Sequence, residues 1–226
     1  MKKEIYVLIG PASIGKTTYL KNINFPRELT SSISRDDIVD SITDKYGYTY
    51  NELFTFPPVD AELGSIVPGF EKYGKVVETP EVARHVCPVS YETLNTVNAE
   101  IHHTYYNAYE KAVNDPEISF VTLDRVHMLK KERLVYFPYL EGKRDKFYIT
   151  AVLFNFKDPD VLDIISELSE MRRKQIEQTG RFKTIPRDIQ QRMIDRYEDV
   201  TLEEGFDSIL EIDTLPKLRE LINEKK

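Results

Sequence analysis

Short apolar runs rich in β-branched residues alternate along the chain with longer stretches whose apolar residues recur at helical spacing. The short runs have the length and residue types of buried strands, whereas the longer stretches have the period of amphipathic helices. Strands are therefore expected at residues 4–9, 29–33, 118–123, 147–154 and 208–212. Strands that alternate with helices predict an α/β fold, with a mainly parallel sheet of four to five strands flanked by helices.

Helices are expected between and after these strands. They are predicted at residues 16–21, from 34 onward, at 90–113 and 130–140, from 158, from 186 and at 215–222. Asp158 is expected to cap one of them, with Pro159 at its first helical position. Residues 46–90 are rich in Tyr, Pro and Gly and have weak periodicity. This pattern predicts a loop-rich insertion, or the acceptor-side wall of a cleft.

Composition limits the classes of protein that the chain can represent. The net charge of −7 argues against a protein that coats nucleic acid through a global basic field, although a local basic groove is compatible with it. No apolar stretch approaches the roughly 20 residues of a membrane span. The first strand begins almost at Met1, so we expect no signal peptide and a cytoplasmic location, in the host if the source is viral. Cys87 is the single cysteine, which excludes an internal disulfide.

Residues 10–17 read Gly-Pro-Ala-Ser-Ile-Gly-Lys-Thr, a complete phosphate-binding loop (P-loop) between a predicted strand and a predicted helix. In this setting backbone N–H groups and the helix N-terminus surround a polyphosphate. Lys16 is expected to neutralise the β- and γ-phosphates of ATP, and the Thr17 hydroxyl to bind Mg²⁺. The expected donor site comprises Gly10, Pro11, Ala12, Ser13, Ile14, Gly15, Lys16, Thr17 and Thr18. The alternative is an ordinary turn that contains Gly and Pro.

Other signals favour a phosphotransferase within the P-loop NTPase fold. The chain has no Asn-Lys-x-Asp sequence to read guanine, and the strand that ends at Asp124 carries a single acid followed by Arg125, unlike most motor ATPases. A kinase needs a base near the acceptor hydroxyl. Asp36 follows Lys16 by 20 residues, at the end of the second predicted strand, where it is expected to lie beside the P-loop. Ser34 and Asp37 also fit a helix-capping box, so a capping role stays open.

Several segments together resemble one family. The P-loop, the Arg-Asp-Asp triplet at 35–37 and the run at 124–133 are similar to bacteriophage 5′-hydroxyl polynucleotide kinases, as are residues 180–186 and 204–207. The resemblance covers most of the chain except residues 46–90. It implies a single P-loop kinase domain over residues 1–226 that transfers the γ-phosphate of ATP to the 5′-OH end of DNA or RNA. The insertion or acceptor-side segment would then span 46–115.

The resemblance also implies roles for individual residues. Asp36 corresponds to the general base of these enzymes, and Arg173 and Arg181 best match the lid arginines that clamp the donor phosphates, with Arg172 as a close competitor. The expected acceptor-side residues are Arg35, Asp37, Asp124, His127, Lys131 and Arg133. Asp124 is also expected to hold Mg²⁺ through water. Structural roles stay open for each of these residues: a turn acid, a hydrogen-bonded core histidine or a solvated basic helix face.

Two alternative functions remain. One is a P-loop kinase for a small molecule such as a nucleoside, nucleotide or sugar-nucleotide, which the acidic net charge and Val39, in place of an arginine common in the family, favour slightly. The other is an ATP-binding regulatory protein without kinase activity. The sequence does not indicate an oligomeric state or a preference between DNA and RNA.

Overall fold

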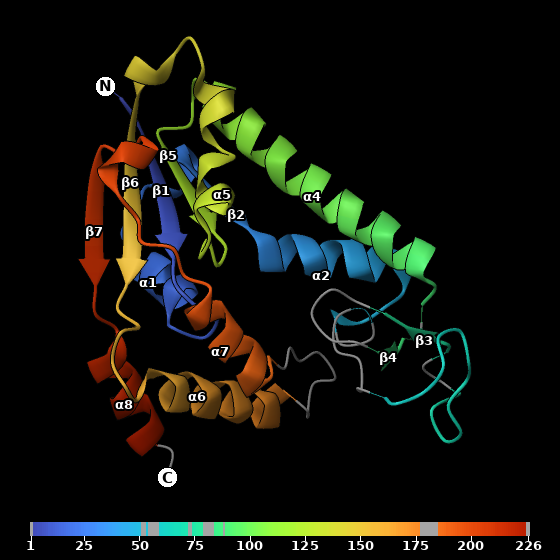
Figure 1. Cartoon of the computed structure of the whole chain (residues 1–226). Helices are drawn as coiled ribbons and strands as arrows, with labels where there is room; N and C mark the ends of the chain where they lie inside the picture. The colour runs from blue at the N-terminus through green and yellow to red at the C-terminus, as the bar shows by residue number, and fades with distance from the viewer. Residues whose placement is uncertain are drawn as a thin grey trace. The chain divides into compact units, whose positions relative to one another are not determined.

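Five parallel strands form the main sheet of the chain (Figure 1). The computed structural model describes residues 2–50, 53, 59–71, 74–78, 84–87, 89–176 and 185–224. The strands are β1 (Lys3–Ile9), β2 (Thr30–Ser34), β5 (Phe120–Asp124), β6 (Phe147–Phe154) and β7 (Ser208–Ile212). They are ordered β2-β5-β1-β6-β7 and each neighbouring pair is parallel. The predicted α/β fold with a mainly parallel sheet is therefore confirmed.

The central strand β1 carries the P-loop at its carboxyl end. Ile5, Leu8 and Ile9 are at most 1 % exposed, because helices cover both faces of a parallel sheet. Residues Lys3–Ile9 pair with Phe147–Leu153 of β6, and Glu4–Val7 pair with Phe120–Leu123 of β5. The P-loop therefore starts between the ends of two flanking strands, where a crevice is expected in folds of this kind.

In the described part of the chain, five helices that lie wholly or mostly in the same unit as these strands connect or follow them. They are α1 (Lys16–Asn22), α5 (Lys130–Leu134), α6 (Val161–Ile176), α7 (Arg187–Asp195) and α8 (Leu215–Asn223). Figure 1 shows α6 and α7 beyond the carboxyl ends of β1 and β6. Two helix predictions need correction. The single helix expected at 130–140 is divided into α5 and a 3₁₀ turn at Phe137–Leu140, since proline at position 138 disrupts a continuous α-helix.

The second correction concerns the start of α6. The helix begins at Val161 instead of Pro159. Asp158 accepts a hydrogen bond from the backbone N–H of Asp160 (2.8 Å), so its carboxylate closes a local turn two residues before the helix.

The chain divides into two compact units. The first comprises Met1–Ser34, Tyr106–Lys174 and Ile185–Lys226, and the second comprises Arg35–Tyr105 and Gln175–Thr184. The second contains α2 (Arg35–Tyr46), the N-terminal part of α4 (Tyr91–Asn114), and a two-stranded antiparallel sheet of β3 (Val76–Val77) and β4 (His85–Val86). It has its own apolar core, formed by Val39, Ile42, Leu53, Cys87, Val89, Leu94, Val97 and Ile101. Among the described residues, no helix is long and apolar enough to span a membrane.

Candidate nucleotide-binding site

The P-loop contains two residues whose backbone lies in the left-handed region. Gly15 has φ +97° and Ser13 has φ +67°. A left-handed backbone costs little at glycine, whereas other residues are strained there, so Gly15 allows the tight turn into α1. At Gly10 a side chain would meet neighbours, because an added Cβ would lie 3.1 Å from both Ile14 Cγ2 and Phe154 Cβ. Both motif glycines therefore have a steric reason to be glycine.

Lys16 is held against the loop that precedes it. The residue is 8 % exposed, and its Nζ donates to the carbonyl oxygens of Gly10 (2.9 Å) and Pro11 (2.7 Å). Its ammonium group is thus directed toward the loop instead of extending into solvent. A cation in this place at the first turn of α1 adds to the positive end of the helix dipole. The arrangement suits the binding of an anion such as a polyphosphate.

Thr17 and Asp124 join α1 to the end of β5. The Thr17 hydroxyl donates to Asp124 Oδ2 over 2.7 Å. Asp124 is the last residue of β5, which pairs with β1 as far as Val7 and Leu123, so the strand register brings the carboxylate to the loop. A hydroxyl and a carboxylate are oxygen ligands, the kind that Mg²⁺ prefers, and they fit a magnesium ion that keeps several water ligands.

Two further contacts fix the loop at its sides. The Gly10 N–H donates to the Val126 carbonyl (3.1 Å), and the Thr214 hydroxyl donates to the Ile14 carbonyl (2.6 Å). Thr214 precedes α8, and its Cβ lies 3.6 Å from the position of a Cβ on Gly15. Sequence reasoning missed Thr214, although its position directly before a helix that follows a strand is typical of a residue at the ligand edge of a parallel sheet.

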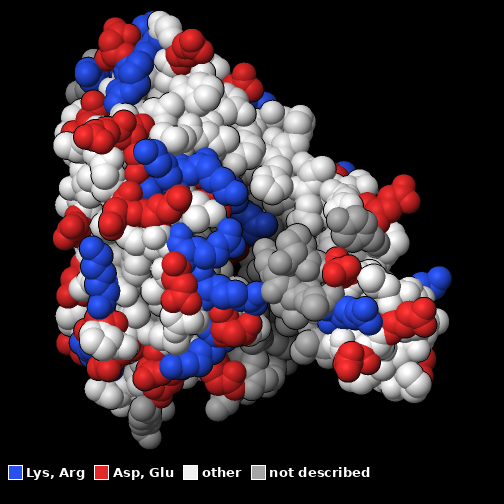
Figure 2. Space-filling model, viewed as in Figure 1, with Lys and Arg blue, Asp and Glu red and all other residues white. Residues whose placement is uncertain are grey.

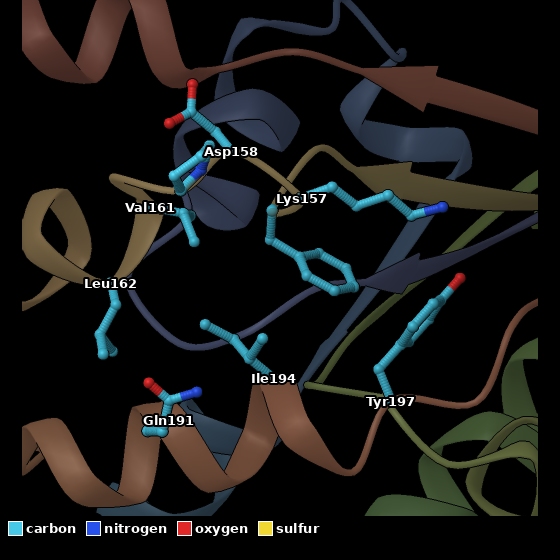
Figure 3. Close-up of a pocket in the computed structure, with 9 residues that line it drawn as sticks. Lys157, Asp158, Val161, Leu162, Gln191, Ile194 and Tyr197 are labelled. Atoms are coloured by element: carbon cyan, nitrogen blue, oxygen red, sulfur yellow. The ribbon is translucent and has the colours of Figure 1, made fainter.

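A cavity of about 400 Å³ opens where the chain leaves β6 (Figure 3). Its walls come from the segment after β6, the start of α6 and the helix α7. The lining residues are Phe156, Lys157, Asp158, Pro159, Val161, Leu162, Gln191, Ile194 and Tyr197. Phe154, the last residue of β6, is in contact with Gly10, so this segment begins beside the P-loop.

The cavity combines apolar walls with polar groups. The rings of Phe156 and Tyr197 meet edge to face, with centroids 4.8 Å apart. Burial raises the pKa of the Tyr197 hydroxyl, which accepts a hydrogen bond from the Val200 N–H (3.3 Å). The pKa of Asp158 is lowered by the Asp160 N–H and by the Arg219 guanidinium, which lies 2.9 Å away. Mixed walls of this kind are typical of small-molecule sites.

Two residues expected on the acceptor side lie in the interior instead. His127 and Arg133 are both 0 % exposed. Arg133 forms a two-point ion pair with Glu204, from Nε to Oε2 (2.7 Å) and from Nη2 to Oε1 (2.8 Å). It also donates to three backbone carbonyls, those of His127, Met128 and Asp199. These placements indicate structural roles and do not support contact with a substrate. Lys131 is exposed on α5.

Charges of both signs are spread over the molecular surface. Figure 2 shows Lys and Arg side chains gathered near the middle of the viewed face, with acidic groups around them. Exposed basic residues of the first unit occur on and around α5 and α7, at Lys130, Lys131, Arg187 and Arg196. A chain with a net charge of −7 thus still carries local basic groups.

Asp36 and Asp37 lie in the first turn of α2, in the second unit. Asp36 follows Ser34, the last residue of β2, by two positions, and the register partner of Ser34 on β5 is Asp124. Burial raises the pKa of the Tyr50 hydroxyl, and the nearby Asp36 carboxylate adds to this effect. The approach of Asp36 to the P-loop stays a prediction, as do the acceptor-side roles of Arg35 and Asp37.

The expected lid arginines cannot be described at the level of side chains. Arg172 and Arg173 are part of α6, but their side chains lie outside the described part of the structure. Arg181 lies outside the described residues altogether. Among the residues that are described, no group of three or more His, Cys, Asp or Glu could hold a metal ion on its own.

No protein-family model matches the chain, and no curated protein matches its sequence. Solved structures are similar to it over nearly its whole length. One is a fungal RNA kinase (16 % identity, TM-score 0.47, covering 98 % of this chain and 82 % of that one). Another is a putative kinase from Chloroflexus aurantiacus (13 % identity, TM-score 0.48, covering 99 % and 94 %).

A third similar structure is TT1252 from Thermus thermophilus (14 % identity, TM-score 0.38, covering 99 % and 96 %). Two of these three neighbours are thus described as kinases. The TM-scores of all three are below 0.5 and their identities are 16 % or lower, so these similarities do not show a function for this chain.

Proposed function

We propose that this protein is an ATP-dependent kinase that transfers the γ-phosphate to the 5′-hydroxyl end of a polynucleotide. The observation that carries the phosphotransferase part is the arrangement of Lys16, Thr17 and Asp124. Lys16 is directed toward the P-loop by two carbonyl contacts, and Thr17 is hydrogen bonded to the acid at the end of the neighbouring strand. A cation, a hydroxyl and a carboxylate around a glycine loop are the groups that phosphoryl transfer from ATP requires.

On the donor side the chain binds and orients the triphosphate. Backbone N–H groups of residues 12–17 and the N-terminus of α1 surround the phosphates, and Lys16 neutralises part of their charge. Thr17 and Asp124 would hold Mg²⁺, Asp124 through water. When bound, this ion would neutralise negative charge on the β- and γ-phosphates. The cavity after β6 has room for the nucleoside part of ATP.

On the acceptor side we assign Asp36 as the general base. An attacking hydroxyl must lose its proton during transfer, and a carboxylate within hydrogen-bond distance can accept it. Asp36 is the second residue of α2 and lies two residues after the end of β2, and two residues of chain span at most about 7 Å. We further assign Arg173 and Arg181, with Arg172 as an alternative, to clamping the donor phosphates, since a guanidinium binds phosphate oxygens at two points.

The second part of the proposal concerns the acceptor, which we propose to be a polynucleotide. It is supported by the sequence resemblance at 35–37 and 124–133 and by the exposed basic residues around α5 and α7. A small-molecule acceptor is the second candidate, favoured by the acidic net charge. Both candidate functions use the same ATP-binding site, so only the identity of the acceptor that becomes phosphorylated distinguishes them.

The deciding experiment is transfer of label from γ-labelled ATP in the presence of Mg²⁺. A DNA or RNA oligonucleotide with a 5′-OH end should become labelled, whereas one with a 5′-phosphate end should not. A panel of nucleosides and nucleotides tested in parallel would identify a small-molecule kinase. ATP binding without transfer to any acceptor would favour a regulatory protein and contradict the proposal.

Two variants test the assigned residues in the same assay. Lys16→Ala should abolish transfer, since the loop then lacks its cation. Asp36→Asn keeps the shape of the side chain but removes the base, so kcat should fall by about 10²-fold or more while ATP still binds. Near-normal turnover in the second variant would leave Asp36 with a capping role alone.

A further inference from the structure

The segment between β5 and α5 contains a histidine that the phosphoryl-transfer chemistry does not use. His127 is 0 % exposed and its backbone has φ +50°, a left-handed conformation that is uncommon outside glycine. A residue keeps such a conformation only where its surroundings impose it. The imidazole ring of His127 has a hydrogen bond to Leu8 of β1, the strand that carries the P-loop.

Both ring nitrogens of His127 have a hydrogen-bond partner. Nδ1 lies 2.7 Å from the Leu8 carbonyl oxygen, and Nε2 lies 2.5 Å from the Tyr136 hydroxyl. A carbonyl oxygen can only accept, so Nδ1 must carry the proton. Nε2 then has a lone pair and accepts from the Tyr136 hydroxyl. The partners therefore define one neutral tautomer, with hydrogen on Nδ1.

The surroundings also oppose a second proton on the ring. The pKa of His127 is lowered to about 3, mainly by burial. The hydrogen bond to the Leu8 carbonyl opposes this shift, and the positive charges of Arg125, Lys16 and Arg133 contribute to it. The imidazole ring of His127 therefore stays uncharged while it is hydrogen bonded to Leu8 and Tyr136, whereas an exposed histidine titrates near neutral pH.

We propose that His127 is a positioning residue that fixes the end of β1 to the segment after Asp124, and so sets the Thr17–Asp124 pair. Val126 and His127, which are consecutive in the chain, form the two hydrogen bonds that join this segment to β1 and the P-loop. The Val126 carbonyl accepts from the Gly10 N–H, and His127 Nδ1 donates to the Leu8 carbonyl, so the two bonds lie on either side of Ile9. They fix the residue at which strand becomes loop.

The position of His127 affects the donor site because few residues separate it from Asp124. Asp124 is three residues from His127, and Thr17 is the second residue of α1, the helix that follows the loop. The 2.7 Å bond between the Thr17 hydroxyl and Asp124 depends on the relative position of these two segments. Loss of a group that orients the ligands of a metal commonly costs 10- to 100-fold in metal affinity. The role in turnover rests on the proposed kinase function, whereas the role in holding Mg²⁺ and ATP does not.

The test compares two substitutions at position 127. His127→Asn keeps an N–H donor close to the place of Nδ1, and asparagine tolerates a left-handed backbone. His127→Ala removes the donor. In His127→Ala the Mg²⁺ concentration for half-maximal ATP binding should rise by about 10-fold or more, and His127→Asn should recover most of this loss. Equal losses in the two variants would overturn the proposal, because a role in packing alone does not depend on the donor.

A buried histidine of the second unit supplies the control. His85 is 5 % exposed and belongs to β4. His85→Ala should lower thermal stability without changing the Mg²⁺ requirement. A similar change in the Mg²⁺ requirement at position 85 would attribute the effect at 127 to general loss of stability and would contradict the proposal.

A measurement on the wild-type protein tests the tautomer even if His127→Ala does not fold. Nitrogen-15 NMR should find Nδ1 protonated and Nε2 unprotonated for His127, with no titration between pH 8 and pH 5. A proton on Nε2, or titration near pH 6.5, would overturn the proposal. If the wild type binds Mg²⁺ and ATP but labels no acceptor, the kinase function fails while both tests of His127 remain valid.

Discussion

The buried ion pair between Arg133 and Glu204 permits a quantitative test of what stabilises the first unit. Their side chains are 0 % and 1 % exposed. All five N–H groups of the guanidinium have acceptors, two on the Glu204 carboxylate and three on backbone carbonyls. The perturbation is Glu204→Gln, which keeps the size of the side chain but removes its charge and turns one acceptor into a donor.

The expected magnitude follows from burial. The variant leaves the Arg133 charge in the interior without a counter-ion and places an amide N–H against a guanidinium N–H. Removing one partner of a buried pair typically costs about 3 to 5 kcal/mol. For a chain of this size each kcal/mol lowers the melting temperature by roughly 2 to 4 °C, so a decrease of roughly 6 to 20 °C is expected.

The assay is urea and thermal unfolding, followed by circular dichroism, of the wild type and the variant. The exposed ion pair between Asp188 and Arg192 on α7 provides a control. The Asp188 side chain is 69 % exposed and lies 2.9 Å from Arg192. Asp188→Asn should cost less than about 0.5 kcal/mol, because solvent screens such pairs. A loss below about 1 kcal/mol in Glu204→Gln would refute the reasoning that burial makes this pair essential.

Three further outcomes are expected. Asp124→Asn should raise the Mg²⁺ concentration for half-maximal ATP binding about 10-fold or more, measured by titration calorimetry; an unchanged requirement would remove Asp124 from the metal site. The pKa of His127 is about 3 in the folded protein, against 6.5 for an ordinary histidine. Between these two values only the unfolded chain is protonated at this ring, so the free energy of unfolding decreases by roughly 1.4 kcal/mol for each unit by which the pH is lowered below 6.5. The slope of unfolding free energy between pH 6 and pH 5 should therefore be smaller in His127→Asn, and an equal slope would contradict this. Gly205→Ala should cost about 1 to 3 kcal/mol more than Gly142→Ala in urea unfolding, since its Cβ would lie 3.0 Å from the Phe137 ring while nothing lies within 4 Å at the control position; equal losses would exclude the clash.

The regular elements were largely predictable because their signals are local. The strands at 147–154 and 208–212 begin and end where the apolar pattern predicts, and the helix expected at 90–113 is observed at Tyr91–Asn114. The errors also have local causes. Pro138 divides the helix expected at 130–140, and the turn closed by Asp158 delays the start of α6.

The site was predictable only in part, because several of its contacts join distant positions. The P-loop is a continuous motif, so its residues could be named directly. His127 contacts Leu8 across 119 positions, Arg133 contacts Glu204 across 71, and Thr214 contacts Ile14 across 200. No local period records such pairs. The apolar neighbours of His127, Val126 and Met128, were the one local sign that it would be buried.

The separate apolar core of the second unit has an implication for protein engineering. The chain leaves the main sheet after Ser34 and rejoins that unit at Tyr106, and the segment between them buries Val39, Leu53 and Val97 among its own side chains. The segment therefore buries apolar side chains of its own, and such burial is the main favourable contribution to folding. A chimera that exchanges residues 35–105 for the equivalent segment of another P-loop protein would leave all five strands and the P-loop chemically intact. Such an exchange would test whether this segment determines the choice of acceptor that we propose.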